Sequence, residues 1–248
     1  MAVRAKAIIA ACLALSFWTG GAGGQEPVPE TIQIGLSTDR VEITADFSGA
    51  DLTIFGSVEN ADPLINRQGR YDVIVVLEGP SRPVVVRRKD RVLGVWINMQ
   101  SETFLNVPVS YSVATTRVPQ DITDPKNYRQ LSLGADNIHI EPIDRAANPF
   151  TIDEFTRALR ERKKATGLYS ERVGGVQFLS ANLFRATLAL APDVPVGTHK
   201  ARAFLFRNGI FVKETSAQLA IVKAGFEQML FRLSTNHSTF YGFVAVGL

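Results

Sequence analysis

Alternation of apolar and polar side chains dominates the first half of the chain. Between residues 41 and 47 the apolar side chains of Val41, Ile43, Ala45 and Phe47 alternate with polar residues. This two-residue period buries one face of a strand and leaves the other in water. Gly, Pro, Asp and Asn punctuate this half and predict turns. The pattern predicts strands at 31–37, 40–46, 51–59, 71–78, 83–89, 92–98 and 103–115.

The pattern changes to helical periodicity between residues 119 and 172. Asp124 followed by Pro125 predicts the start of a short helix, because proline suits the first helical position. Thr151 and Glu154 have the spacing of a capping box, and an apolar stripe with a basic C-terminal end follows them. We therefore expect a short helix and then a longer amphipathic helix in this region.

Strand patterns resume in residues 173–224. Asn208-Gly209 separates two apolar runs, and this dipeptide favours a type I′ turn, which needs positive φ at both central residues. The fold expected is mainly β, with one or more immunoglobulin-like antiparallel β-sandwiches. A β-sandwich part at 25–118 would be followed by a helical insertion at 119–172. Residues 173–224 either complete the first sandwich or form a second one.

The N-terminal residues have the pattern of a secretory signal peptide at 1–24. Arg4 and Lys6 precede an apolar stretch that ends near Trp18, and a Gly/Ala run follows it. The alternative, a permanent membrane anchor, would need about 20 apolar residues. Cys12, which is the single cysteine, lies within this stretch. A second alternative is that Cys12 carries a lipid, because the residues before it loosely resemble a lipoprotein signal.

A second apolar stretch lies at the C-terminal end, in residues 225–248. Phe226 and Leu233 belong to an apolar stripe with helical spacing, and a mostly apolar run begins at Phe240. Aromatic residues at the start of such a run are typical of the bilayer interface. We expect a juxtamembrane helix in this region, followed by a transmembrane helix truncated at Leu248. The alternative is an ordinary buried segment that closes the domain.

Charge composition argues against nucleic-acid binding as a main function. Loss of residues 1–24 would leave 25 basic and 24 acidic residues, so the net charge would fall from +3 to +1. Binding to nucleic-acid phosphates needs a concentrated basic field, which this balance does not supply. With 46% hydrophobic residues, the chain has the composition of a folded protein.

The sequence offers no recognisable catalytic or metal-binding motif, and we predict no cofactor. His139, His199 and His237 are far apart in the chain, and no thiol lies beyond Cys12. His139 and Glu141 would share one face of a strand, which supplies two metal ligands but not a complete site. The chain has no nucleophile elbow, phosphate-binding loop or dinucleotide fingerprint.

Four cations, Arg87, Arg88, Lys89 and Arg91, are grouped after a valine-rich run. We expect an exposed hairpin at this point, whose charges discourage edge pairing. The alternative is that the charges form a compact cationic rim at the turn, a weak candidate for binding anions or acidic lipid headgroups. Trp96 lies in an alternating strand, where we expect it to fill the core, with ligand stacking as the alternative.

The segment from Leu36 to Glu59 resembles the opening of a family of transmembrane proteins from alphaproteobacteria and their relatives. The residues that carry this resemblance are Phe47, Gly49, Asp51, Leu52, Phe55 and Gly56. A weaker likeness extends to the C-terminal apolar end. The resemblance implies an exported β-rich body tethered by one C-terminal helix. It also implies an accessory role beside a sulfite-exporter-like permease, without assigning a reaction or ligand-binding residues.

These observations predict a non-enzymatic protein anchored to the bacterial inner membrane by a single helix, with most of the chain in the periplasm. Its expected partners are the membrane itself and a polytopic transporter. The alternative is a periplasmic module that binds a small ligand or an anion at the cationic hairpin. An enzyme with an unrecognised site is a third possibility, which would have to use carboxylates that the sequence alone does not pair.

Overall fold

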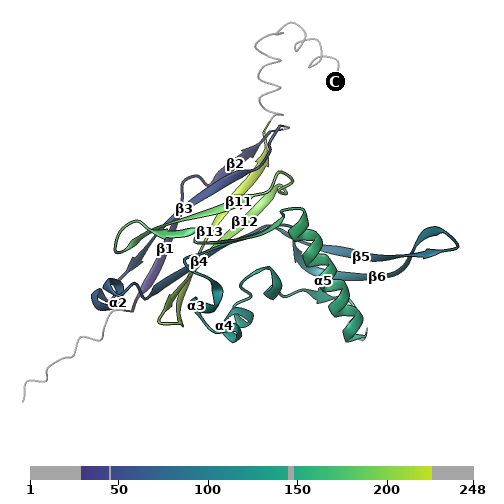
Figure 1. Ribbon diagram of the computed structural model, residues 1–248. Helices are drawn as coiled ribbons and strands as arrows, with labels where there is room; N and C mark the ends of the chain where they lie inside the picture. The colour runs from purple at the N-terminus through teal and green to yellow at the C-terminus, as the bar shows by residue number, and fades with distance from the viewer. Residues whose placement is uncertain (1–28, 45, 145–147, 225–248) are drawn as a thin grey trace, which may run out of the picture.

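The computed structural model describes residues 29–44, 46–144 and 148–224. Two β-sheets pack face to face, helices cover the outer face of the second sheet, and a long hairpin projects from the side (Figure 1). The expected signal at 1–24, including Cys12, and the expected membrane helix at 225–248 lie outside the described residues. His237 lies outside them as well.

The strands of the described chain form three hydrogen-bonded sheets. The order in the first sheet is β1 (Thr31–Leu36), β3 (Ala50–Glu59), β11 (Leu183–Leu190) and β10 (Val176–Phe178). The order in the second is β2 (Arg40–Ile43), β13 (Ile210–Lys223), β12 (Gly197–Arg207), β4 (Tyr71–Glu78), β7 (Tyr111–Thr115) and β9 (Tyr169–Val173). The order in the third is β5 (Ser81–Val92), β6 (Val95–Pro108) and β8 (Glu141–Pro142).

The main hydrophobic core lies between the first two sheets. Strand β4 is buried along almost its whole length, as expected for a strand with a packed layer on each side. Its residues Val73, Val75 and Leu77 belong to the core between the sheets, whereas Ile74 and Val76 belong to a second core under the helices. The body is therefore three layers thick at β4.

Strands that follow the helical region pair with strands that precede it. The sequence pattern did not decide whether these two sets of strands share one sandwich. Strand β11 pairs with β3, and β12 pairs with β4, both antiparallel. Two pairs are parallel, β2 with β13 and β7 with β9. The mainly β prediction is confirmed, and the strands before and after the helical region share the same sheets.

Short helices cover the outer face of the second sheet. They are α3 (Pro119–Ile122), α4 (Pro125–Gln130) and the 3₁₀ turn η1 (Ala135–Asn137), while α2 (Pro63–Arg67) leads into β4. Pro125 occupies the first turn of α4 after Asp124, as predicted. Ile122 and Tyr128 are buried against Phe204 and Phe206 of β12. Apolar burial of this kind fixes short helices that would be marginal alone.

The predicted amphipathic helix is α5 (Pro149–Ala165), but its N-cap is not Thr151. Asn148 is the cap, and its side chain accepts a hydrogen bond from the Phe150 backbone N–H. Proline at position 149 favours this earlier start. The buried stripe contains Phe155 and Leu159, which pack with Phe104 of β6 at the base of the hairpin.

The turn between β12 and β13 is as the sequence predicted. Asn208 and Gly209 have φ values of 50° and 83°, which are those of a type I′ turn. Four of the predicted strands are wrong in their bounds. The strand predicted at 40–46 ends at Ile43, and the one predicted at 83–89 extends over residues 81–92. The strands predicted at 92–98 and 103–115 are divided differently. Residues 95–108 form the single strand β6, and β7 begins separately at Tyr111.

Candidate functional site

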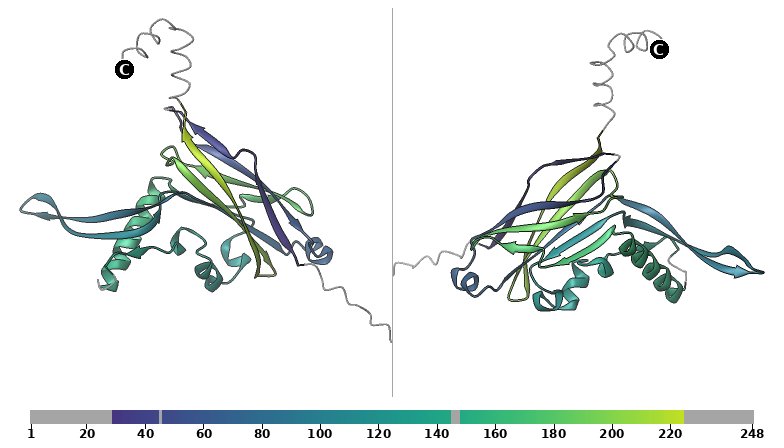
Figure 2. Two further views of the ribbon diagram at one scale, coloured as in Figure 1. Left: turned by 180° about the vertical axis from the view of Figure 1, so that it is seen from behind. Right: turned by 45° about the horizontal axis from the view of Figure 1, so that its top comes forward.

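The β5–β6 hairpin is an insertion between two neighbouring strands of the second sheet. Strands β4 and β7 pair directly, and the Gly79 N–H donates to the Ser110 carbonyl over 2.9 Å where the insertion leaves the sheet. A short turn would join such strands, yet residues 80–109 form a long two-stranded ribbon that projects from the body in all views (Figures 1 and 2). Long surface insertions on a rigid scaffold commonly carry function.

Helix α5 supports the base of the ribbon on one face. Val84, Val86 and Phe104 contact the Phe155 side of α5 in a small hydrophobic cluster. We call residues 84–91 and 100–104, which include the ribbon's part of this cluster, the shaft of the ribbon, and residues 92–99 its tip. The tip is the part of the ribbon farthest from the body (Figure 2).

The strand register places the four cations of the candidate patch on opposite faces of the shaft. Residues that pair across an antiparallel ladder point to the same face, and side chains alternate along a strand. Arg88 pairs with Gln100, on the face of Val86, and its guanidinium lies 3.2 Å from Glu154 of α5 and 3.8 Å from Asp90. The exposed hairpin that we expected is present. The four cations do not form one compact rim, because Arg88 faces α5 and is neutralised there.

The remaining three cations form one row, which we call the cationic face. Arg87, Lys89 and Arg91 lie opposite Ser101, Asn98 and Trp96 in the register. No carboxylate occurs among these paired residues, and the described part of the chain shows no ion pair to any of the three cations. Arg91 donates from Nε to the Gly94 carbonyl over 3.3 Å, which directs it along the turn. The cationic face is therefore an uncompensated positive surface.

The tip exposes an unusual amount of apolar surface. Leu93 is 100% exposed, Trp96 is 65% exposed, and the other large apolar residues of the tip are Val92, Val95, Ile97 and Met99. The expectation that Trp96 fills the core is wrong, because the ribbon extends beyond the body and nothing in the described chain covers it. Exposed apolar patches of this kind commonly mark interaction sites.

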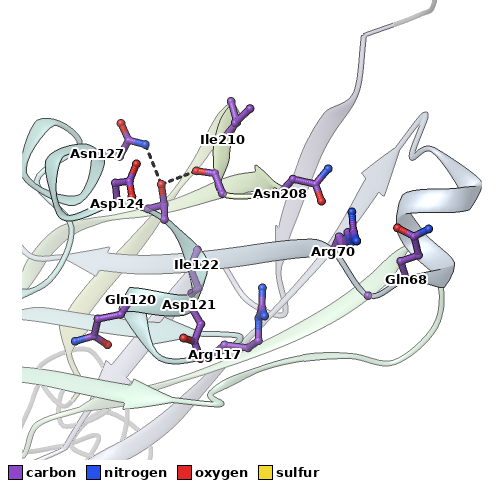
Figure 3. A pocket seen from close by; sticks show the side chains of 13 residues that line it. Gln68, Arg70, Arg117, Gln120, Asp121, Ile122, Asp124, Asn127, Asn208 and Ile210 are labelled. Atoms are coloured by element: carbon purple, nitrogen blue, oxygen red, sulfur yellow. Dashed lines mark hydrogen bonds between the residues drawn. The ribbon is translucent and has the colours of Figure 1, made fainter.

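A polar cavity of about 740 Å³ lies on a different part of the body, between the start of β4, helices α3 and α4 and the β12–β13 turn (Figure 3). Arg70 and Arg117 line it together with Asp121 and Asp124. Arg117 is already paired with the buried Asp72. Because the acids offset the arginines, the cavity suits a neutral polar molecule better than an oxyanion.

A family model described as "Putative transmembrane protein (Alph_Pro_TM)" matches residues 31–248. The chain belongs to this family. The resemblance drawn from Phe47, Gly49, Phe55 and Gly56 is thereby confirmed, and the family name implies an alphaproteobacterial origin. No curated protein and no solved structure matches the chain.

The family description associates the chain with a membrane. Among the residues that the structure describes, no helix combines the length and apolar character that crossing a bilayer requires. Among the described elements, the hairpin exposes several large apolar side chains at its tip beside a row of unpaired cations. We therefore take it as the candidate functional site of this family member.

The fold also brings together a serine and a histidine that are distant in the sequence. The Ser110 hydroxyl lies 3.2 Å from Nε2 of His199, whose Nδ1 lies 3.2 Å from the Gly197 carbonyl. This arrangement resembles a nucleophile and its base. However, His199 is fully buried, and a Cβ at Gly79 would lie 3.1 Å from Nε2. Such close packing leaves no room for a substrate, so the pair is structural.

His139 and Glu141 are also brought together, at 3.1 Å between Nε2 and Oε1. They are the pair that the sequence placed on one face of a strand. A metal centre needs at least a third protein ligand. The described residues contain no group of three or more potential ligands.

Acidification is expected to destabilise the fold through His199. Burial lowers its pKa below the ordinary value of 6.5, so the unfolded chain takes up this proton first. The contribution is complete above pH 6.5 and is lost as the pH falls from 6.5 through the folded-state pKa. Urea unfolding at pH 7.5 and 5.5 measures the difference. His199→Gln should reduce this pH dependence. Equal pH dependence in the parent protein and the variant would contradict the assignment.

Proposed function

We propose that this chain is a non-enzymatic interaction protein of the bacterial inner membrane, with its body in the periplasm, which acts as an accessory to a polytopic transporter. The β5–β6 hairpin is the observation that carries this proposal. It is a long inserted element whose tip is apolar, exposed and without a covering partner in the described chain. An insertion with these properties is better suited to docking than to chemistry.

The other parts of the proposal come from the sequence and from the family description. The expected export signal at 1–24 and the expected single-pass anchor at 225–248 would place the body in the periplasm. Binding is favoured over catalysis because close packing around Ser110 and His199 excludes a substrate. The accessory role, and a sulfite-exporter-like permease as partner, follow from the resemblance to the family.

We further propose that the two facing sheets form an immunoglobulin-like sandwich. In the first sheet the order β1-β3-β11-β10 corresponds to the immunoglobulin strands A, B, E and D. In the second sheet the series β13-β12-β4 corresponds to the immunoglobulin strands G, F and C. Strand β7 then occupies the position that a variable-type domain gives to C′. On this correspondence the hairpin is an insertion between C and C′, and helices α3, α4 and α5 follow C′.

Photo-crosslinking in the native membrane tests the accessory role. With benzoylphenylalanine in place of Val85, a half-exposed residue of the shaft, the full-length protein is expected to form an adduct with one multi-spanning transporter. The matched control carries the same group at Ile210, which is similarly exposed but is the first residue of β13, next to the β12–β13 turn. Mass spectrometry identifies the adducts. Capture of unrelated proteins from both positions, or of none, would contradict the proposal.

A further inference from the structure

We propose that the tip of the β5–β6 hairpin inserts into the anionic leaflet of a lipid bilayer. This inference deepens the proposed membrane association and rests on it. The apolar side chains of the tip would enter the interface, and the cationic face would lie at the level of the lipid headgroups. Three features of the ribbon support this arrangement, and a fourth limits how deep the tip can enter.

The first feature is that the tip is apolar on both of its faces. Val92 pairs with Val95 on the face that also carries Ile97, whereas Trp96 shares the opposite face with Arg91. All four side chains are at least 39% exposed. A flat protein surface would cover one face of such a ribbon and leave the other in water. A fluid apolar medium covers both faces together, which favours lipid over a protein surface.

The second feature is the residue at the apex. Leu93 has φ 51° and Gly94 has φ 87°, so both central residues of this turn have a left-handed backbone conformation. Asn-Gly is the dipeptide most often found in turns of this kind. A leucine in this region is strained. Since Leu93 is fully exposed, no contact in the described chain compensates for the strain. Strain that the fold does not require points to a role outside the fold.

The third feature is the distance of the cations from the apex. Arg91, Lys89 and Arg87 are spaced at two-residue steps along β5, each about 7 Å. Arg91 is the nearest to the apex, and its Nε donates to the Gly94 carbonyl of the turn. Trp96 lies opposite Arg91, and tryptophan is enriched at the bilayer interface with basic residues beside it. The absence of carboxylates from the residues paired with these cations leaves the cationic face free to attract anionic headgroups.

The fourth feature sets a limit on the depth of insertion. Asp90 lies on the opposite face, paired with Ile97 and 3.8 Å from Arg88, which also contacts Glu154. These charges are not expected to enter hydrocarbon. Asp90 is three residues from Leu93, about 10 Å along the strand, so insertion is confined to the interfacial layer, as in proteins that lie on a membrane.

Quenching of Trp96 fluorescence by brominated lipids tests the inference. Trp18 and Trp96 are the two tryptophans of the chain, so a Trp18→Phe background isolates the tip. The full-length protein is reconstituted in vesicles of phosphatidylcholine alone or with about one third phosphatidylglycerol. In the anionic vesicles we expect stronger quenching by bromines close to the headgroup than by deep ones. High salt or neutral vesicles should reduce the quenching several-fold.

The variant Leu93→Asn separates membrane insertion from folding. Asparagine suits the left-handed turn, so the variant should fold at least as well as the parent and yet lose most of the quenching. Phe150→Ser removes another exposed aromatic residue, in the first turn of α5, and should leave the quenching unchanged. Equal loss in both variants would overturn the inference.

The two proposals fail in distinguishable ways. If Trp96 is unquenched in every vesicle while the Val85 crosslinker still captures a transporter, the lipid inference is overturned and the accessory role stands. A protein adduct from a photo-crosslinker at Leu93, without quenching, would assign the tip to a protein pocket. Absence of both quenching and capture would refute both proposals.

Discussion

Gly56→Ala is expected to destabilise the sandwich by about 3 kcal/mol, because the added Cβ has no space. It would lie 2.5 Å from the Gln33 carbonyl oxygen of β1 and 2.7 Å from Cε1 of Phe184 on β11. Phe184 is fully buried, so its ring has little freedom to move. Urea unfolding, monitored by circular dichroism, measures the difference. This contact also gives a physical reason for Gly56 within the segment that resembles the family.

Gly35→Ala is the matched control for this prediction. Gly35 lies on the neighbouring strand β1, opposite Phe55, and a Cβ there would meet nothing within 4 Å. Its substitution should change the free energy of unfolding by less than about 1 kcal/mol, with any gain arising because alanine restricts the unfolded chain. Similar losses at the two positions would show that the contact with Phe184 is not the cause.

Arg117→Ala is expected to cost about 3 kcal/mol of stability, although half of the arginine side chain is exposed. Its guanidinium donates from Nε to Oδ1 of Asp72 over 2.9 Å and from Nη2 to Oδ2. Asp72 is 1% exposed, and its other partner is the Thr116 hydroxyl at 2.7 Å. The substitution leaves a buried carboxylate without its counter-ion. Chemical denaturation measures the loss.

A double-mutant cycle with Asp72→Ala separates the pair from its surroundings. The double variant should lose less stability than the sum of the single variants, by about 1–3 kcal/mol, because it removes the buried charge together with its partner. Arg157→Ala is the control, since the Arg157–Asp153 pair on α5 is about two-thirds exposed on both sides, and it should cost less than about 0.5 kcal/mol. Additive losses in the cycle would contradict this account.

Local structure was predictable wherever it depends on nearby residues. The Asn208-Gly209 turn follows from the backbone freedom of those two residues, and the buried stripe of α5 follows from its periodicity. The cap of α5 was misplaced because Thr151 and Asn148 both offer a capping oxygen, and the proline after Asn148 favours the earlier start.

The candidate site was only partly predictable. Alternation shows which residues share a face of a strand, but it does not show whether another layer covers that face, and this is why Trp96 was wrongly expected in the core. The cations were expected at a turn, whereas the chain turns at Leu93-Gly94. The glycine in that dipeptide was the available signal. Contacts such as Ser110 with His199 depend on strand pairing that the pattern does not specify.

The two-residue period of the ribbon constrains how its length can change. Each strand advances about 3.4 Å per residue, and a single added residue in each strand would reverse the faces beyond it. Insertion of two residues in each strand would keep Arg87, Lys89 and Arg91 on a common face and move the tip outward by about 7 Å. The distance between the sandwich and whatever surface the tip contacts is therefore adjustable in discrete steps, without any change to the core.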